Sequence, residues 1–203
     1  MDTILEEDCR PPRSCEMPDL SELYDKVLLT LILNVWLRGR GPKDQKASIF
    51  VTSFIRLVDK TLVEYKYSRS ALLEYVNTPA NTMSPLFRAT AHLETCIHSL
   101  KRAIRFAEHI RRDKKSPTIP QKLDVISKSA QIRITVVRDA IEHMDDRIIK
   151  GKIPKNGPVA LIMKSDCLEL AGEIITYIEL AEWIKQLHRL ALEFADYQDQ
   201  PVE

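Results

Sequence analysis

Glycine is scarce in this sequence, which contains only 5 glycines among 203 residues. Sheet-rich folds need many tight turns, and glycine is the residue that most of those turns require, so its scarcity argues against a β-sandwich or a barrel. The hydrophobic fraction of 44% and the charged fraction of 29% are ordinary for a globular chain. The length therefore predicts one domain, at roughly 150 residues a domain, with a core of its own.

Long apolar runs and a strong net charge are also missing. The most apolar stretch, residues 27–37, covers only about half of the roughly 20 residues that a membrane-spanning helix needs, so we expect a buried core helix there and no membrane partner. The start of the chain is acidic where a secretory signal is basic, so export is not expected. With a net charge of +1, any nucleic-acid site must be a local patch.

The 4 cysteines show no metal-binding pattern, because they include neither a Cys-x-x-Cys pair nor a histidine partner at ligand spacing. We interpret them as reduced thiols of a cytoplasmic protein. The sequence predicts no metal site and no cofactor.

Hydrophobic residues recur at three- and four-residue intervals along most of the chain, which predicts an all-α, antiparallel bundle of about five helices. Residues 1–18 have three prolines and no such periodicity, so we expect a flexible lead-in to a single domain over residues 19–203. The helices are expected from Asp19 to about Leu37, through Phe50–Tyr65, through Leu93–Ala107, from about Gln121 to Lys150, and after Thr176. The apolar stretches Val159–Met163 and Leu168–Leu170 predict a small β-hairpin before the last helix.

The fourth predicted helix carries the polar residues that suggest chemistry, namely Arg138, Asp139 and His143. Asp139 and His143 lie about 40° apart on a helix, so their side chains can meet. Arg138 and His143 point about 140° apart, and a shared site needs either a long reach by the arginine or a second copy of the helix. The competing interpretation is a solvated helix face with a modest Asp139–His143 surface pair.

The segment Arg138 to His143, which reads RDAIEH, resembles the signature of the HEPN superfamily (higher eukaryotes and prokaryotes nucleotide-binding): Arg, a polar residue, three variable residues and His. This resemblance implies a metal-independent endoribonuclease, commonly a homodimer in which two motifs face each other across a cleft. His143 would then act as general acid or base, and Asp139 would orient it. Arg138 would neutralise charge developing on the phosphate. The attacking group would be the 2′-hydroxyl of the RNA itself.

Two positions depart from the family pattern. Many members have Asn after the Arg, whereas Asp139 adds a negative charge beside the expected phosphate site. Some toxin members that a partner nucleotidyltransferase silences carry Tyr two residues after the His, where this chain has Asp145, so that mode of control is not expected. A toxin or phage-defence role, with an antitoxin or other partner protein, belongs to what the resemblance implies.

Several other residues have simpler interpretations. Arg102, Arg105 and Arg147 are candidates for RNA binding. The basic end of the third helix, which also includes Arg111 and Arg112, is interpreted first as cations that stabilise a helix C-terminus and second as a phosphate-binding patch. The lone histidines of other helices, His98 and His188 among them, are interpreted as structural. Two alternatives to a nuclease stay open: a non-catalytic helical bundle that dimerises or binds a protein partner, and nucleotide binding without cleavage through Arg138.

Overall fold

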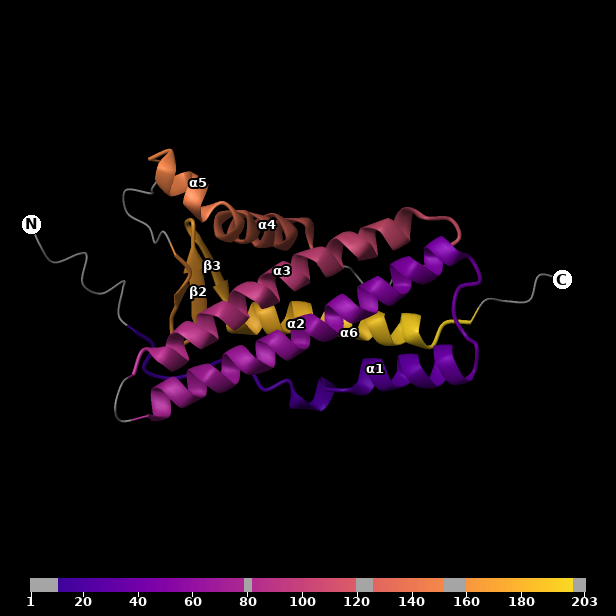
Figure 1. Cartoon of the computed structure of the whole chain (residues 1–203), viewed down its shortest axis with the longest axis horizontal. Helices are drawn as coiled ribbons and strands as arrows, with labels where there is room; N and C mark the ends of the chain where they lie inside the picture. The colour runs from indigo at the N-terminus through magenta and orange to yellow at the C-terminus, as the bar shows by residue number, and fades with distance from the viewer. Residues whose placement is uncertain (1–10, 79–81, 120–125, 152–159, 199–203) are drawn as a thin grey trace, which may run out of the picture.

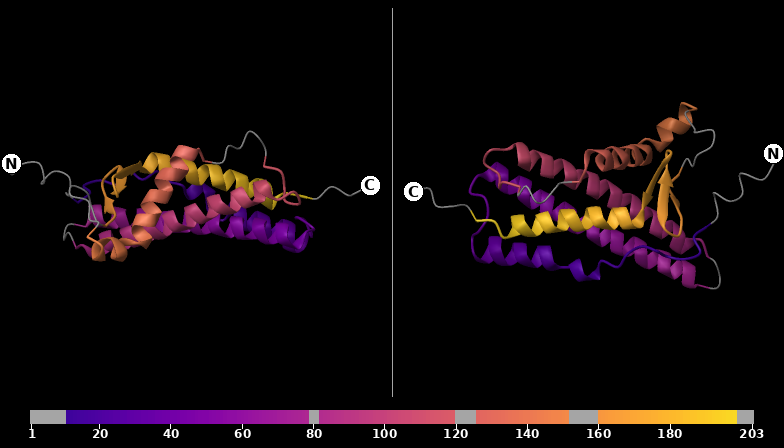
Figure 2. Two further views of the ribbon diagram at one scale, coloured as in Figure 1. Left: turned by 90° about the horizontal axis from the view of Figure 1, so that it is seen from above. Right: turned by 180° about the vertical axis from the view of Figure 1, so that it is seen from behind.

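The bundle is built from two layers of helices. The computed structural model describes residues 11–78, 82–119, 126–151 and 160–198. In chain order its elements are η1 (Ser21–Leu23), α1 (Lys26–Leu31), η2 (Ile32–Leu37), α2 (Gln45–Asn77), α3 (Ser84–Arg112), α4 (Lys128–Glu142), α5 (Met144–Ile149), β1 (Ile162–Met163), β2 (Cys167–Leu170), β3 (Glu173–Thr176) and α6 (Tyr177–Ala195). The long helices α2 and α3 form one layer, and α1, α6 and α4 cover one face of it, with α6 in the middle (Figure 1, Figure 2). The predicted all-α bundle with a small hairpin is confirmed.

The antiparallel pair α2–α3 supplies much of the core. Asp44 begins α2 as an N-cap, because its carboxylate accepts hydrogen bonds from the backbone N–H groups of Lys46 and Ala47, both at 3.1 Å. Buried apolar side chains recur along both helices at three- and four-residue spacing: Phe54, Val58, Leu62, Tyr65, Leu72, Leu93, Ile97, Leu100, Ile104 and Ala107. Between the two helices, the Ser68 hydroxyl donates to the Ala89 carbonyl oxygen at 2.8 Å.

The first predicted helix is broken into three pieces. The chain turns at Asp25, whose φ of 63° lies in the left-handed region, and then continues as α1 and the π-helix η2. Asn34 of η2 is buried and fixes this segment to the end of α6. Its amide donates to the Ala195 carbonyl oxygen at 3.2 Å and to Asp196 Oδ1 at 2.9 Å, so it satisfies groups at a helix C-terminus.

The expectation that residues 27–37 form a buried core helix is wrong for most of their apolar side chains. Val27 and Leu31 are buried, but five side chains are between 39% and 73% exposed: Leu28, Leu29, Ile32, Leu33 and Leu37. The reason is that α1 lies at one edge of the bundle and packs mainly against α2 and α6, which covers a single side of the helix (Figure 2). Within the described ranges, no helix combines the length and the hydropathy that a membrane crossing requires.

The predicted hairpin is present and has a third strand that the sequence analysis missed. The strand order is β1-β2-β3, and both pairs are antiparallel. Ala171 and Gly172 join β2 to β3 with positive φ values of 55° and 80°, the backbone of a tight type I′ hairpin turn. The chain then enters α6 through a capping box, in which the Thr176 hydroxyl accepts from the Glu179 N–H and the Glu179 carboxylate accepts from the Thr176 N–H.

Residues 11–18 pack against the bundle, whereas the sequence predicts a flexible segment over residues 1–18. Residues 1–10 lie outside the described residues. The Glu16 N–H donates to the Ser165 carbonyl oxygen at 2.8 Å, next to the sheet. Met17 is buried, and its carbonyl oxygen accepts from Arg69 Nε at 2.9 Å. Prolines without periodicity indicate an irregular path, but they do not decide whether that path is anchored.

Candidate functional site

The predicted site lies on α4, an edge helix of the bundle. The Ser127 hydroxyl caps the helix by accepting from the Ala130 N–H at 3.3 Å. Four buried side chains fix the orientation of α4 on the core: Ala130, Ile134, Val137 and Ala140. This orientation leaves Arg138, Asp139 and Glu142 half-exposed, with 27%, 43% and 32% of their side-chain surfaces accessible.

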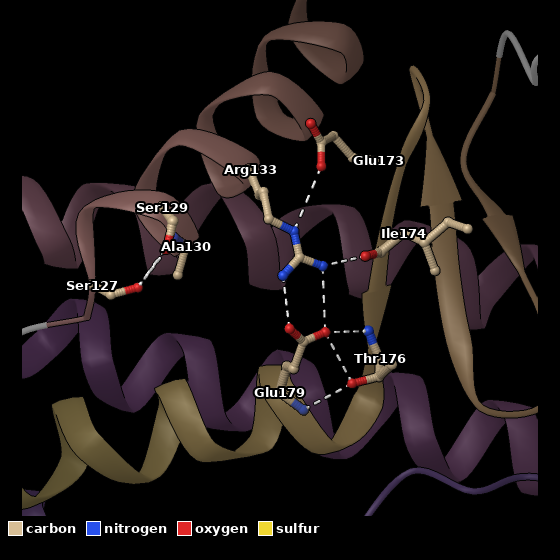
Figure 3. A network of polar contacts seen from close by, with 8 residues as sticks. All are labelled: Ser127, Ser129, Ala130, Arg133, Glu173, Ile174, Thr176 and Glu179. Atoms are coloured by element: carbon tan, nitrogen blue, oxygen red, sulfur yellow. Dashed lines mark hydrogen bonds and ion pairs between the residues drawn. The ribbon is translucent and has the colours of Figure 1, made fainter.

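A salt-bridge network with the sheet and α6 also holds α4 in place (Figure 3). Arg133 Nη1 lies 2.7 Å from Glu179 Oε1, its Nε lies 3.5 Å from Glu173 Oε2, and its Nη2 donates to the Ile174 carbonyl oxygen. Hydrogen bonding to Arg133 lowers the pKa of the Glu179 carboxyl, the same carboxyl that closes the capping box of α6. The network therefore joins α4, β3 and α6 into one unit.

His143 interrupts the fourth predicted helix. Of the range expected to be helical, residues 121–125 lie outside the described residues, α4 ends at Glu142, and α5 begins at Met144. His143 has φ −116° and ψ 26°, which is not helical, although its N–H still donates to the Asp139 carbonyl oxygen at 3.1 Å. The imidazole is exposed and makes no hydrogen bond or ion pair with any residue in the described part of the chain.

Arg138 is paired with two carboxylates of its own helix. Its Nη1 lies 2.7 Å from Asp139 Oδ1, and its Nη2 lies 2.6 Å from Glu142 Oε2. Of the three predicted catalytic residues, Arg138 and Asp139 are thus brought together. The expected side-chain pairing of Asp139 with His143 is not formed among the described residues, because the helix ends between them and Asp139 turns to the arginine.

His98 of α3 joins this group, and the sequence analysis interpreted it as structural. His98 Nδ1 lies 3.3 Å from Glu142 Oε1, so Glu142 bridges Arg138 and His98. Burial lowers the pKa of His98, the nearby Arg138 guanidinium lowers it further, and the Glu142 carboxylate opposes both effects. No local motif indicates this contact, since it depends on the relative register of α3 and α4.

The remaining candidates are more dispersed. Arg102 and Arg105 are exposed on α3, and Arg147 is half-buried on α5. None of the three forms an ion pair with a residue of the described ranges, so their charges are open to a ligand. At the far end of α4 from His143 lies a cavity of about 510 Å³, and Arg111, Arg112 and Lys128 are among the residues that line it.

Within residues 11–78, 82–119, 126–151 and 160–198, no group of three or more His, Cys, Asp or Glu side chains is arranged to hold a metal ion. The chain matches no family model, no curated protein and no solved structure.

Proposed function

We propose that this chain is a HEPN-like, metal-independent endoribonuclease that acts as a homodimer. The observation that supports the proposal most is the position of His143, which lies exposed at the end of α4, five residues after a half-exposed arginine. An exposed imidazole is accessible to RNA, and imidazole is the side chain that acid–base catalysis uses most often.

In this proposal the imidazole of His143 takes the proton of an RNA 2′-hydroxyl. The 2′ oxygen attacks the adjacent phosphorus, the bond from phosphorus to the 5′ oxygen breaks, and the imidazolium of His143 of the partner subunit gives a proton to that oxygen. The products are a 2′,3′-cyclic phosphate and a 5′-hydroxyl. The nucleophile belongs to the substrate, so the protein supplies acid–base groups and positive charge.

Arg138 would stabilise the charge on the phosphate. A guanidinium has five N–H donors, and the contacts with Asp139 and Glu142 each engage one terminal nitrogen, so further donors are free for phosphate oxygens. The two carboxylates hold the guanidinium in place, but their charges also oppose the approach of a phosphate. The affinity for RNA should therefore be lower than it would be with a neutral side chain at position 139.

A second copy of the chain would bring together the arginine and histidine side chains that do not converge within one copy. Apolar side chains suitable for contact with that copy lie on both sides of His143: Ile132 on α4 is 63% exposed, and Ile148 and Ile149 on α5 are 48% and 80% exposed. A two-fold axis near His143 would place the same surface of both copies in contact. The two imidazoles would then lie on the two sides of one cleft.

Cleavage of single-stranded RNA in the presence of EDTA tests the proposal. The His143→Ala and Arg138→Ala variants should both lose cleavage, whereas the controls His109→Ala on α3 and Arg56→Ala on α2 should keep it. Circular dichroism shows whether each variant is folded. If His143→Ala cleaves as well as wild type, the activity comes from a contaminant and the proposal fails.

Mixing wild type with an inactive variant tests the dimer separately. A cleft that uses both imidazoles predicts that added His143→Ala lowers the cleavage by a fixed amount of wild type once the two proteins exchange subunits, because a mixed dimer retains only one of the two histidines. Cleavage that stays constant, from proteins that are shown to exchange subunits, contradicts a shared cleft.

A non-catalytic bundle that self-associates is the second candidate, and the exposed apolar side of α1 and η2 favours it. Five exposed aliphatic side chains within residues 28–37 form a larger apolar surface than single exposed residues do. This side and α4 lie at opposite edges of the bundle, so pairing through α1 would keep the two His143 side chains apart (Figure 1). Light scattering distinguishes the candidates: a Leu29→Glu, Leu33→Glu variant becomes monomeric if α1 forms the interface, and an Ile149→Glu variant does so if the α4–α5 edge forms it.

A further inference from the structure

The cavity at the start of α4 has the charge and the donors of an anion site. It lies where the C-terminal end of α3, the N-terminal end of α4 and the side of α6 meet, and its volume is about 510 Å³. Among the residues that the structure describes, the lining has three cations, Arg111, Arg112 and Lys128, and one carboxylate, that of Glu108. These four groups together carry a net charge of +2 near neutral pH, from three positive charges and one negative charge.

The three cations differ from the neighbouring cations Lys115 and Lys46, which form ion pairs. Lys115, just after α3, pairs with Asp44 at 2.9 Å, and Lys46 pairs with Asp113 at 3.4 Å, so these two carboxylates are already engaged. Arg111, Arg112 and Lys128 form no ion pair with any residue that the structure describes. Arg111 and Arg112 do stabilise the C-terminus of α3 by their charge, as the sequence analysis expected.

Lys128 has no such role, because it occupies the first position of α4, beside the positive end of the helix dipole. A cation at this place destabilises its own helix. In the first turn of α4, the Ser127 hydroxyl caps the Ala130 N–H at 3.3 Å, and the positive end of the helix dipole adds to the positive potential at the cavity. The position of Lys128 is thus unfavourable for folding and favourable for binding an anion.

We propose that this cavity binds a phosphate group. Guanidinium groups match phosphate oxygens with paired N–H donors, and Arg111 and Arg112 offer two of them. The volume lies in the range of roughly 300–1,000 Å³ that small-molecule sites have, which is more than a bare phosphate fills. The Gln131 amide nitrogen already donates to the Ile126 carbonyl oxygen at 2.8 Å, which leaves its second N–H and its oxygen for a ligand. Together with the Gln186 amide, these groups can bind a ribose or a base, so a nucleotide unit suits the remaining space.

The phosphate belongs either to a free nucleotide or to an RNA strand, and the RNA alternative rests on the proposed function. Arg138 lies ten positions after Lys128 on α4, a rise of about 15 Å along the helix. A strand held in the cavity by one phosphate would pass along α4 toward Arg138 and His143. The cavity would then position the substrate, at a distance from the scissile bond.

Binding and stability measurements on the full chain test the site. The probes are inorganic phosphate, adenosine 5′-monophosphate and a labelled single-stranded RNA of about 12 nucleotides, a length that a single-strand groove can accommodate. The His143→Ala background keeps the RNA intact. A Lys128→Gln, Arg112→Gln variant should bind at least about tenfold more weakly, the equivalent of one charge-assisted hydrogen bond. A Lys60→Gln, Arg56→Gln variant, changed on α2, is the matched control and should bind as wild type does.

The single variant Lys128→Gln separates a binding role from a structural one. It should weaken binding and yet raise the melting temperature of the free protein by about 1–3 °C, because a cation leaves the positive end of α4. For the RNA probe, the slope of log K against log salt should fall by about 0.7 for each cation removed. A binding loss that merely follows a loss of stability would contradict the proposal.

The three probes also identify the source of the phosphate. If the mononucleotide binds and the RNA does not, the phosphate comes from a free nucleotide. If the RNA binds and the mononucleotide does not, the phosphate comes from an RNA strand. If no probe binds, or if all bind the double variant as tightly as wild type, the cavity is not a phosphate site. RNA bound through the cavity but not cleaved by wild type would leave this proposal standing and end the nuclease proposal. Cleavage by wild type that the double variant leaves unaffected would keep the nuclease proposal and rule out an RNA strand as the source of the phosphate.

Discussion

The Glu142 carboxylate lies 2.6 Å from the Arg138 guanidinium one helical turn before it. Its other oxygen lies 3.3 Å from His98 Nδ1 on a neighbouring helix. The Glu142 carboxylate thus connects Arg138, which belongs to the predicted site, with His98, which the sequence analysis did not assign to it. The electrostatics of the site depend on the sum of these charges rather than on any one pair.

Changes to Arg138 and Glu142 should move the pKa of His98 in opposite directions. Glu142→Gln removes a negative charge that favours the imidazolium, so the pKa of His98 should fall. Arg138→Gln removes a positive charge that disfavours the imidazolium, so the pKa should rise. Titration of the histidine ring signals by NMR measures both effects, and Asp146→Asn, whose partner is Lys150, should leave the His98 curve in place. Shifts of the same sign in both variants would refute the arrangement.

Asp139→Asn should increase both RNA affinity and cleavage if the proposed nuclease is correct. The substitution removes one negative charge next to Arg138, and a unit charge near a surface phosphate contributes about 1 kcal/mol, or about fivefold in affinity. Filter binding and cleavage assays at constant salt measure the effect. Asp146→Asn removes an equal negative charge, but from a carboxylate that pairs with Lys150, so it should have a smaller effect. A loss of cleavage in Asp139→Asn would instead indicate that this carboxylate acts in the reaction.

His188 should make the fold less stable in mild acid. Its ring is buried, its Nε2 lies 3.0 Å from the Leu23 carbonyl oxygen, and burial lowers its pKa below the ordinary value of 6.5. The folded state therefore holds fewer protons than the unfolded state, and the free energy of unfolding falls as the pH falls through 6.5 toward the lower folded pKa. Above that window the contribution is fully present. Denaturant unfolding from pH 8 to pH 5 should show a smaller loss for His188→Gln than for wild type, and equal losses would contradict the assignment.

The capping box at the start of α6 should contribute measurably to stability. Thr176→Ala removes the hydroxyl that accepts from the Glu179 N–H at 3.2 Å. Loss of such a cap costs about 1 kcal/mol, which lowers the melting temperature by about 2–4 °C for a domain of this size. Thr52→Ala on the exposed side of α2 is the control, and thermal melts of the two variants should differ by that amount. Identical melts would show that the box in Figure 3 is energetically neutral.

The periodicity of apolar residues predicts the helices because each helix buries one side, and that pattern is local. It does not predict where a helix breaks. Asp25 takes a left-handed conformation without glycine, and His143 leaves the helix in the middle of an unbroken apolar pattern. The strand Glu173–Thr176 was missed although Ala171 and Gly172 form a two-residue turn before it. A two-residue turn with glycine in second place is a local hairpin signal, so the sequence does contain the information that predicts this strand.

The candidate site was predictable in part for the same reason. Arg138 and Asp139 are neighbours in sequence, so their proximity needed no tertiary information. The contact of His98 with Glu142 and the cavity beside Lys128 both arise where α3 and α4 meet, and inter-helix register cannot be read from one helix at a time. The exposure of residues 28–37 likewise depends on how many neighbouring elements cover the helix, and this number cannot be predicted from the hydropathy of the helix itself.

The docking of residues 11–18 has a consequence for biosynthesis. The Arg13 N–H donates to the Ser165 hydroxyl, 152 residues later in the chain. A ribosome that adds about 5–20 residues per second needs roughly 8–30 s to make the intervening polypeptide. During that time Met17 can already contact Arg69, but Arg13 and Glu16 lack the partner that Ser165 provides, so this segment docks completely only after residue 165 has been made.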